Sequence, residues 1–216
     1  MTLRRRLRTI VFSTALVTGG LAAVPLATGT AAAAKSPVIR NDPLAPIAQR
    51  ALDSLVEFDA TGDLTARGRY DADRHSIAVV VAERLLVDPT NLENAWRRAD
   101  AAHQKALMGA FSQLGTPYRT NSSKPGVGFD CSGLTTYAWA QAGIALPRQS
   151  GSQISSIAKR TPETAEAGDI VYYPGHAMMW LGVDTAIVHA PYSGRTVEVD
   201  FVSKSHRSVR YGDPLG

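Results

Sequence analysis

The sequence is poor in cysteine: its 216 residues include only Cys131. A single cysteine cannot form an internal disulfide, so the chain does not belong to the small domains that disulfides hold together. The spacings Cys-x-x-Cys and His-Glu-x-x-His are absent, as is the Gly-x-Ser-x-Gly turn of many serine hydrolases. These absences exclude the common zinc-site patterns and that class of serine enzyme.

Acidic residues are missing from the first 41 positions, whereas four arginines lie between Arg4 and Arg8. The formal net charge of +4 arises entirely there, because residues 35–216 hold 19 basic and 19 acidic residues. A neutral chain offers no long-range attraction for nucleic acid or for an anionic membrane surface. We therefore expect neither as a partner.

Residues 1–34 have the pattern of an export signal. The arginines are followed by an uncharged stretch, Thr9–Ala34, whose end places Ala32 and Ala34 in the A-x-A arrangement of a cleavage site. A retained membrane anchor is the alternative, but the apolar block Ile10–Val17 is short for a span. We therefore predict a signal peptide of the Sec or twin-arginine type, a transient membrane contact and a secreted protein.

The remaining chain divides into two parts. We predict a linker and helical segment over 35–100 and a second domain over 101–216. In the first part, apolar residues at helical spacing predict helices over 46–57 and 77–87, whereas glycine and aspartate predict a loop over 59–73. The β-branched run at 79–81 leaves a strand as the alternative for 77–87.

A further helical stretch spans the boundary between the two parts. Thr90–Glu93 forms a capping box, and apolar residues at helical spacing continue from Leu92 to Leu114. His103 lies on this apolar stripe, where a histidine is more often a packed core residue than a ligand.

The second part changes from helix to strand. Asp130 is placed to cap a helix that begins at Cys131 and stops at Gly143, and a capping box at Ser150–Gln153 opens a short helix. Strand-like runs then follow, separated by turns, at 169–173, 176–181, 186–190, 197–202 and 208–211. Helices followed by an antiparallel sheet predict an α+β fold, here with five to six strands.

Cys131 has the surroundings of a nucleophile. At the N-terminus of the predicted helix, unpaired backbone N–H groups and the helix dipole favour the thiolate. Ser132 and Gly133 leave room for a substrate beside the sulfur. A cysteine nucleophile also needs a histidine base that a third polar group orients, and His176 and His189 lie on two later strands.

One hairpin register brings these two histidines together. If Val183-Asp184 forms a two-residue turn, the numbers of paired residues sum to 367, so that Met178 faces His189. His176 then lies diagonally opposite His189 on the same face, about 7 to 8 Å away at the backbone, and the two imidazoles can hydrogen-bond. An odd-length loop would place them on opposite faces of the sheet.

Metal binding is the competing interpretation. Cys131, His176 and His189 could ligate zinc, but no fourth ligand lies at a useful spacing. The stretch 59–63 loosely resembles a calcium loop, but it lacks the glycine and the closing glutamate of an EF-hand. We therefore expect no metal and no cofactor.

Ordered motifs surround the candidate residues throughout residues 101–216. They are LGTPY at 114–118, GFDCSGLT at 128–135, LPRQS at 146–150, AGDIVYY at 167–173, GHAMMWLG at 175–182 and IVHAP at 187–191. Together they closely resemble the NlpC family of papain-like cell-wall cysteine peptidases. The match preserves the family's order of cysteine, histidine and third polar residue.

The resemblance implies a papain-like fold and a secreted or wall-associated cysteine endopeptidase that hydrolyses peptidoglycan stem peptides. The bond that this family typically cleaves joins γ-D-glutamate to a diamino acid, often meso-diaminopimelate. By this analogy Cys131 is the nucleophile, His176 is the general base and then the general acid, and His189 orients His176.

The resemblance also implies a set of substrate-facing groups around the nucleophile. The backbone N–H of Cys131 and Tyr118 would stabilise the oxyanion, and Asp130 and Ser132 would line the substrate side. Asp130 has a structural interpretation as a helix cap as well, and Tyr118 as a packing residue. The choice between function and structure stays open for Arg148, Ser150 and Gln153.

Other functions stay open at this point. An N-acetylmuramoyl-L-alanine amidase or a cross-bridge peptidase would use the same chemistry, and a wall-binding protein could use the same fold without catalysis. Residues 35–100 match no wall-binding repeat, so they either pack against the catalytic domain or cover its groove. We expect a monomer whose partner is the peptidoglycan stem peptide.

Overall fold

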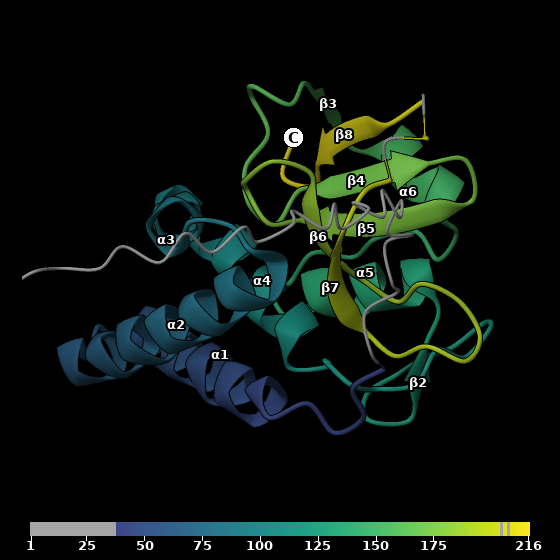
Figure 1. Ribbon diagram of the computed structural model, residues 1–216. Coiled ribbons are helices and arrows are strands. Elements are labelled where there is room, and N and C mark those ends of the chain that lie inside the picture. Colours follow the sequence, from purple (N-terminus) through teal and green to yellow (C-terminus); the bar gives the residue numbers. More distant parts are fainter. Residues whose placement is uncertain (1–37, 204, 207) are drawn as a thin grey trace, which may run out of the picture. The chain divides into compact units, whose positions relative to one another are not determined.

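The computed structural model describes residues 38–203, 205–206 and 208–216 (Figure 1). The predicted signal peptide, residues 1–34, lies outside the described residues. Within them, no helix combines the length and the apolar character that a membrane span requires.

Four helices come first along the described chain. They are α1 (Leu44–Thr61), α2 (Leu64–Leu85), α3 (Pro89–Arg98) and α4 (Ala101–Phe111). Aspartate side chains accept backbone N–H groups at the start of the last three helices, at Asp63, Asp88 and Asp100. These caps satisfy donors that have no partner inside a helix, and they fix where each helix begins.

The loop predicted over 59–73 is wrong, because helix continues through most of that stretch. Only Gly62 and Asp63 interrupt it: Gly62 adopts a left-handed conformation (φ 72°) that ends α1, and Asp63 caps α2. The predicted capping box at Thr90–Glu93 is also wrong, since Asp88 starts α3 two positions earlier. The long helical stretch that follows is broken between α3 and α4.

Within the described residues, six strands form an antiparallel sheet. They are β3 (Ala158–Arg160), β4 (Ile170–Tyr173), β5 (His176–Trp180), β6 (Ala186–His189), β7 (Glu198–Phe201) and β8 (Arg210–Asp213), in the order β3-β8-β4-β5-β6-β7. Two short strands, β1 (Ser123–Lys124) and β2 (Gly128–Phe129), pair separately. The remaining helices are α5 (Cys131–Ala140) and α6 (Ser150–Ser156). The α+β prediction is confirmed.

The hairpin of β5 and β6 has the predicted register. Met179 pairs with Val188 and Trp180 with Ile187, so the paired numbers sum to 367. Because side chains alternate between the faces of a strand, this register places His176 and His189 on one face of the sheet.

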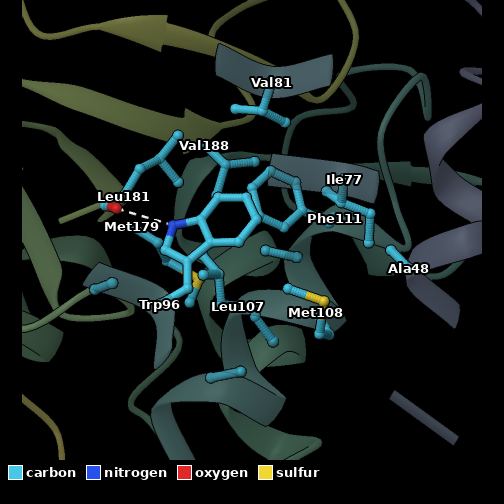
Figure 2. Packing of buried hydrophobic residues seen from close by; sticks show 14 of the residues in the cluster. Ala48, Ile77, Val81, Trp96, Leu107, Met108, Phe111, Met179, Leu181 and Val188 are labelled. Carbon is cyan, nitrogen blue, oxygen red and sulfur yellow. Dashed lines mark hydrogen bonds between the residues drawn. The ribbon is translucent and has the colours of Figure 1, made fainter. Parts of the chain in front are cut away.

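One hydrophobic core joins the helices to the sheet. Trp96 of α3 is fully buried; its ring centroid lies 5.1 Å from that of Phe111, and its indole N–H donates to the carbonyl oxygen of Leu181 (2.9 Å; Figure 2). Met179 of β5 and Val188 of β6 belong to the same cluster. The segment before residue 101 thus packs into the core that the sheet uses, which favours a packing role for it. The domain boundary at residue 101 stays a prediction.

A buried charge cluster connects α4 to the sheet. His103 Nε2 lies 3.0 Å from Asp169 Oδ1 and 3.4 Å from Asp213 Oδ1, and His103 Nδ1 lies 3.0 Å from Asp100 Oδ1. Burial opposes the charged imidazolium, but the hydrogen bond to Asp169 and the negative charges of Asp100 and Asp169 outweigh burial and raise the pKa of His103 to about 9. His103 is therefore a buried residue that carries charge at neutral pH.

We predict that Trp96→Ala destabilises helices and sheet together. The substitution removes a fully buried indole and leaves the Leu181 carbonyl without its donor, a loss of about 3 to 5 kcal/mol of unfolding free energy. Urea unfolding followed by circular dichroism should show one transition at a lower midpoint, with Trp96→Phe intermediate. Separate transitions for the helices and the sheet would contradict a shared core.

We also predict a pH-dependent stability that His103 causes. Its folded pKa of about 9 lies above its ordinary value of 6.5, so its contribution is complete below pH 6.5 and is lost as the pH rises through 9. The difference corresponds to about 3 kcal/mol. Urea titrations between about pH 6 and about pH 10 measure this slope, which His103→Gln should remove. The exposed His75→Gln is the control and should keep the slope; equal slopes in both variants would contradict the assignment.

Candidate active site

Cys131 is the first residue of α5 and is partly exposed. The carboxylate of Asp130 caps this helix by accepting the N–H of Gly133 (2.7 Å). A Cβ at position 133 would collide with the carbonyl oxygen of Ser122, so this position requires glycine. Cys131 Sγ lies 3.8 Å from the carbonyl oxygen of Gly175, the residue before β5. The sulfur therefore lies beside the turn that leads into His176.

His176 and His189 are joined by a hydrogen bond between neighbouring strands. His176 Nε2 lies 2.9 Å from His189 Nδ1, and the ring planes are at 81°. Both side chains are buried. The bond occupies Nε2 of His176, so Nδ1 is the nitrogen that remains for a thiol. The structure thus brings the predicted histidine pair together.

Burial keeps both imidazoles neutral. It lowers the pKa of His176 to about 4, with a further contribution from the charge of His206. Burial also lowers the pKa of His189, and the charges of His176 and Arg195 lower it further. A neutral imidazole can accept a proton at neutral pH, which is the state that a general base needs.

Two aromatic rings stack in series next to His176. Tyr173 pairs with His176 across the β4–β5 hairpin, and the ring centroids are 5.1 Å apart with planes at 29°. His206 stacks on the same tyrosine at 3.8 Å and 7°. No motif in the sequence indicates this stack as a whole. The turn at Pro174-Gly175 could have indicated the Tyr173 pairing, but no periodicity in the sequence places His206.

Asp130 has a second partner besides its helix. Arg148 donates from Nη1 to Oδ1 (2.9 Å) and from Nη2 to Oδ2 (2.6 Å) of Asp130, which is a bidentate ion pair. Arg148 Nη1 also donates to Oγ of Ser132 (3.0 Å). The residues on both sides of Cys131 are therefore held by one guanidinium.

Gln153 fastens α6 to α5. It is fully buried, donates to the carbonyl oxygen of Ser132 (3.0 Å) and accepts from the hydroxyl of Thr135 (2.8 Å). These contacts are structural. The capping box predicted from Ser150 is wrong: Gln149 is the N-cap of α6, without a side-chain cap, and Ser150 is the first helical residue.

Tyr118 lies close to the nucleophile candidate. It forms an isolated bridge with Phe129, two residues before Cys131, and its N–H donates to the carbonyl oxygen of Arg195 (2.9 Å). Burial raises the pKa of its phenol, and the negative charges of Cys131 and Asp130 raise it further. The phenol therefore stays protonated and can donate a hydrogen bond.

Histidine and carboxylate groups come close enough to hold a metal ion in three sets of described residues. The sets are Asp100, His103 and Glu166; His103, Asp169 and Asp213; and His189, Glu198 and Asp200. In the first two, ion pairs engage both nitrogens of His103. The expectation of no metal and no cofactor stays a prediction.

The fold and the site together define an α+β domain of the papain-like type, in which a helix that begins at a cysteine packs against the strands that carry a histidine pair. Residues 115–213 match the model of the NlpC/P60 family. This part of the chain is therefore an NlpC/P60 domain, and the resemblance found in the sequence is confirmed.

Curated relatives share this domain. The peptidoglycan endopeptidase RipB of Mycobacterium tuberculosis is 35% identical over 50% of this chain, and the bifunctional muramidase/DL-endopeptidase CwlT of Bacillus subtilis is 36% identical over 38%. The chain spans only 52% and 26% of the lengths of these relatives. Among solved structures, the P60 domain of a Mycobacterium avium subspecies paratuberculosis antigen is 29% identical, with 53% of this chain and 96% of that chain covered at a TM-score of 0.47.

We predict that His206→Gln raises the pKa of His176. The charge of His206 is one of the two causes that lower the pKa of His176 to about 4, so its removal makes the imidazolium of His176 less unfavourable. An NMR titration of the His176 ring should show a higher pKa in the variant. His75→Gln removes an exposed histidine of α2 and should leave the titration unchanged. An unchanged His176 pKa in His206→Gln would contradict the placement of His206.

Proposed function

We propose that this protein is a cysteine endopeptidase that hydrolyses peptidoglycan stem peptides. The observation that carries the proposal is the 2.9 Å hydrogen bond between His176 and His189, on strands that pack against the helix that begins at Cys131. A neutral, oriented imidazole and a thiol at a helix N-terminus are the parts that a thiolate mechanism needs. The names of the relatives support peptidoglycan as the substrate.

The proposed first half of the reaction acylates the enzyme. His176 Nδ1 takes the thiol proton of Cys131, and the sulfur attacks the carbonyl carbon of the scissile amide. The backbone N–H of Cys131, which at the first position of α5 has no partner inside the helix, and the phenol of Tyr118 donate to the oxyanion. The carbon–nitrogen bond breaks as His176 returns the proton to the leaving amine.

The second half restores the enzyme. Water gives a proton to His176 and attacks the thioester carbon. The carbon–sulfur bond then breaks to release the carboxylic acid, and His176 returns the proton to the sulfur of Cys131. His189 holds His176 through the Nε2 bond during both halves. In this proposal Asp130 and Ser132 line the substrate side. Arg148 fixes the positions of both side chains through its hydrogen bonds to them. No metal or cofactor takes part in any step.

For the bond, we propose the link between γ-D-glutamate and diaminopimelate. The support is the resemblance of the motifs around Cys131 and the DL-endopeptidase activity in the name of CwlT. An amidase or a cross-bridge peptidase would use the same thiol chemistry on another bond. A non-catalytic wall-binding protein is less well supported, because it would not need a neutral histidine pair beside a cysteine at a helix N-terminus.

We further propose that the protein acts as a secreted or wall-associated monomer. Its substrate lies outside the membrane, and residues 1–34 have the pattern of a cleaved export signal. Neither nucleic acid nor a membrane surface is a partner in this proposal, since the chain without those residues is formally neutral.

The test is mass spectrometry of diaminopimelate-type muropeptides incubated with the protein or with Cys131→Ala. We expect new fragments that end in γ-D-glutamate with the wild type and none with the variant, because the sulfur forms the acyl intermediate. His75→Gln, with its exposed histidine on α2, is the control and should cleave like the wild type.

Other outcomes of this experiment would overturn parts of the proposal. Fragments from a different bond would remove the specificity and keep the thiol mechanism. Cleavage by Cys131→Ala would remove the mechanism. A folded wild-type protein that cleaves nothing but sediments with insoluble peptidoglycan would replace the enzyme with a wall-binding protein.

A further inference from the structure

The outer nitrogen of His189 has no partner in the described part of the chain. Its Nδ1 is engaged with His176, whereas its Nε2 is buried and makes no hydrogen bond there. A neutral imidazole carries one N–H and one lone pair. Which nitrogen of His189 carries the hydrogen therefore decides what His176 can do.

The proposed function fixes this choice of tautomer. For His176 to accept the thiol proton at Nδ1, its hydrogen must be on Nε2, and it must donate to His189 Nδ1. His189 then carries its hydrogen on Nε2, which is a buried donor. A buried N–H without an acceptor is costly, so the correct tautomer needs an acceptor next to His189.

Glu198 of β7 supplies a matching acceptor. It pairs directly with His189 across β6 and β7, and a ring nitrogen of His189 and a carboxylate oxygen of Glu198 lie within 4.8 Å of each other. Arg195 donates to Oε1 of Glu198 from Nε (3.0 Å) and Nη2 (2.7 Å). The second oxygen, Oε2, is buried and has no hydrogen-bond partner among the described residues.

A buried donor and a buried acceptor on paired residues complement each other. We propose that Glu198 is a positioning residue, which accepts the Nε2–H of His189, directly or through one water, and so holds the His189–His176 pair in the tautomer that serves Cys131. This inference rests on the proposed function. The carboxylate also stabilises the positive charge that develops on His176 when the thiol proton arrives.

Arg195 gives Glu198 a second, structural interpretation. The carbonyl oxygen of Arg195 accepts the N–H of Tyr118, so the ion pair between Arg195 and Glu198 also holds a strand-like segment beside the site. If Glu198 served only to hold Arg195, replacing Glu198 would leave the tautomer of His189 unchanged. The two interpretations therefore differ in a spectroscopic readout.

The experiment combines muropeptide kinetics with nitrogen-15 NMR of the histidine rings. In Glu198→Leu we expect kcat to fall about tenfold with KM within about twofold, the rate equivalent of one charge-assisted hydrogen bond. We expect the His189 ring to change from one Nε2–H tautomer to a mixture. Glu198→Gln keeps an acceptor oxygen and should keep the tautomer with a smaller loss of kcat.

Two further variants separate the interpretations. Asp200→Asn tests the other carboxylate within 4.8 Å of a His189 ring nitrogen; because Asp200 is exposed and Glu198 Oε2 is buried, this variant should keep the Nε2–H tautomer. Arg195→Gln removes the ion pair and should keep the Nε2–H tautomer. The proposal is overturned if Glu198→Leu keeps the wild-type tautomer, or if Arg195→Gln reproduces the whole loss of kcat.

The NMR readout does not depend on turnover. If the wild type cleaves no muropeptide, the proposed function fails, while the tautomer of His189 in Glu198→Leu still tests the contact. If the wild type cleaves and the tautomer does not change in Glu198→Leu, the contact fails and the proposed function stands.

Discussion

The hydrogen bond between His176 and His189 is the interaction on which the site depends, and it exists only because β5 and β6 pair in one register. A slip of one residue would turn one of the two imidazoles to the other face of the sheet. Packing helps to fix that register at the turn. Gly182 adopts a φ of 85°, and a Cβ there would collide with Ala95 and crowd Ala167. The register of the hairpin is therefore stabilised by packing against Ala95 and Ala167 as well as by the hydrogen bonds between its strands.

Helix α3, which carries Ala95, contacts the β5–β6 hairpin at two residues. Ala95 of α3 limits the space at Gly182, and the neighbouring Trp96 donates to the carbonyl oxygen of Leu181. Both contacts lie at the end of β5 that is opposite His176, about 15 Å along the strand. The segment before residue 101 thus supports the geometry of the histidine pair from a distance. Such a role requires no contact with substrate, which favours packing over a cover for the groove.

Local signals made part of this site predictable. Asp130 followed by Cys131 indicated a helix start, and the expected even-length turn gave the register that places His176 and His189 on one face of the sheet. The sequence-based prediction is wrong at Gly62-Asp63. A glycine followed by an aspartate is typical of a loop, but here Gly62 ends α1 and Asp63 caps α2. Long-range partners left no local trace at all. Nothing in the spacing indicates that His103 pairs with Asp169, 66 residues later.

The charges around Cys131 have to be considered as a set. Asp130 caps α5, but its carboxylate also brings a negative charge next to the sulfur that becomes a thiolate in the proposed mechanism. Like charges at that distance oppose each other. The bidentate pair with Arg148 and the N–H of Gly133 offset the charge of this carboxylate. Asp130 and Arg148 therefore form one unit: the carboxylate places the helix start, and the guanidinium makes that carboxylate compatible with the chemistry beside it.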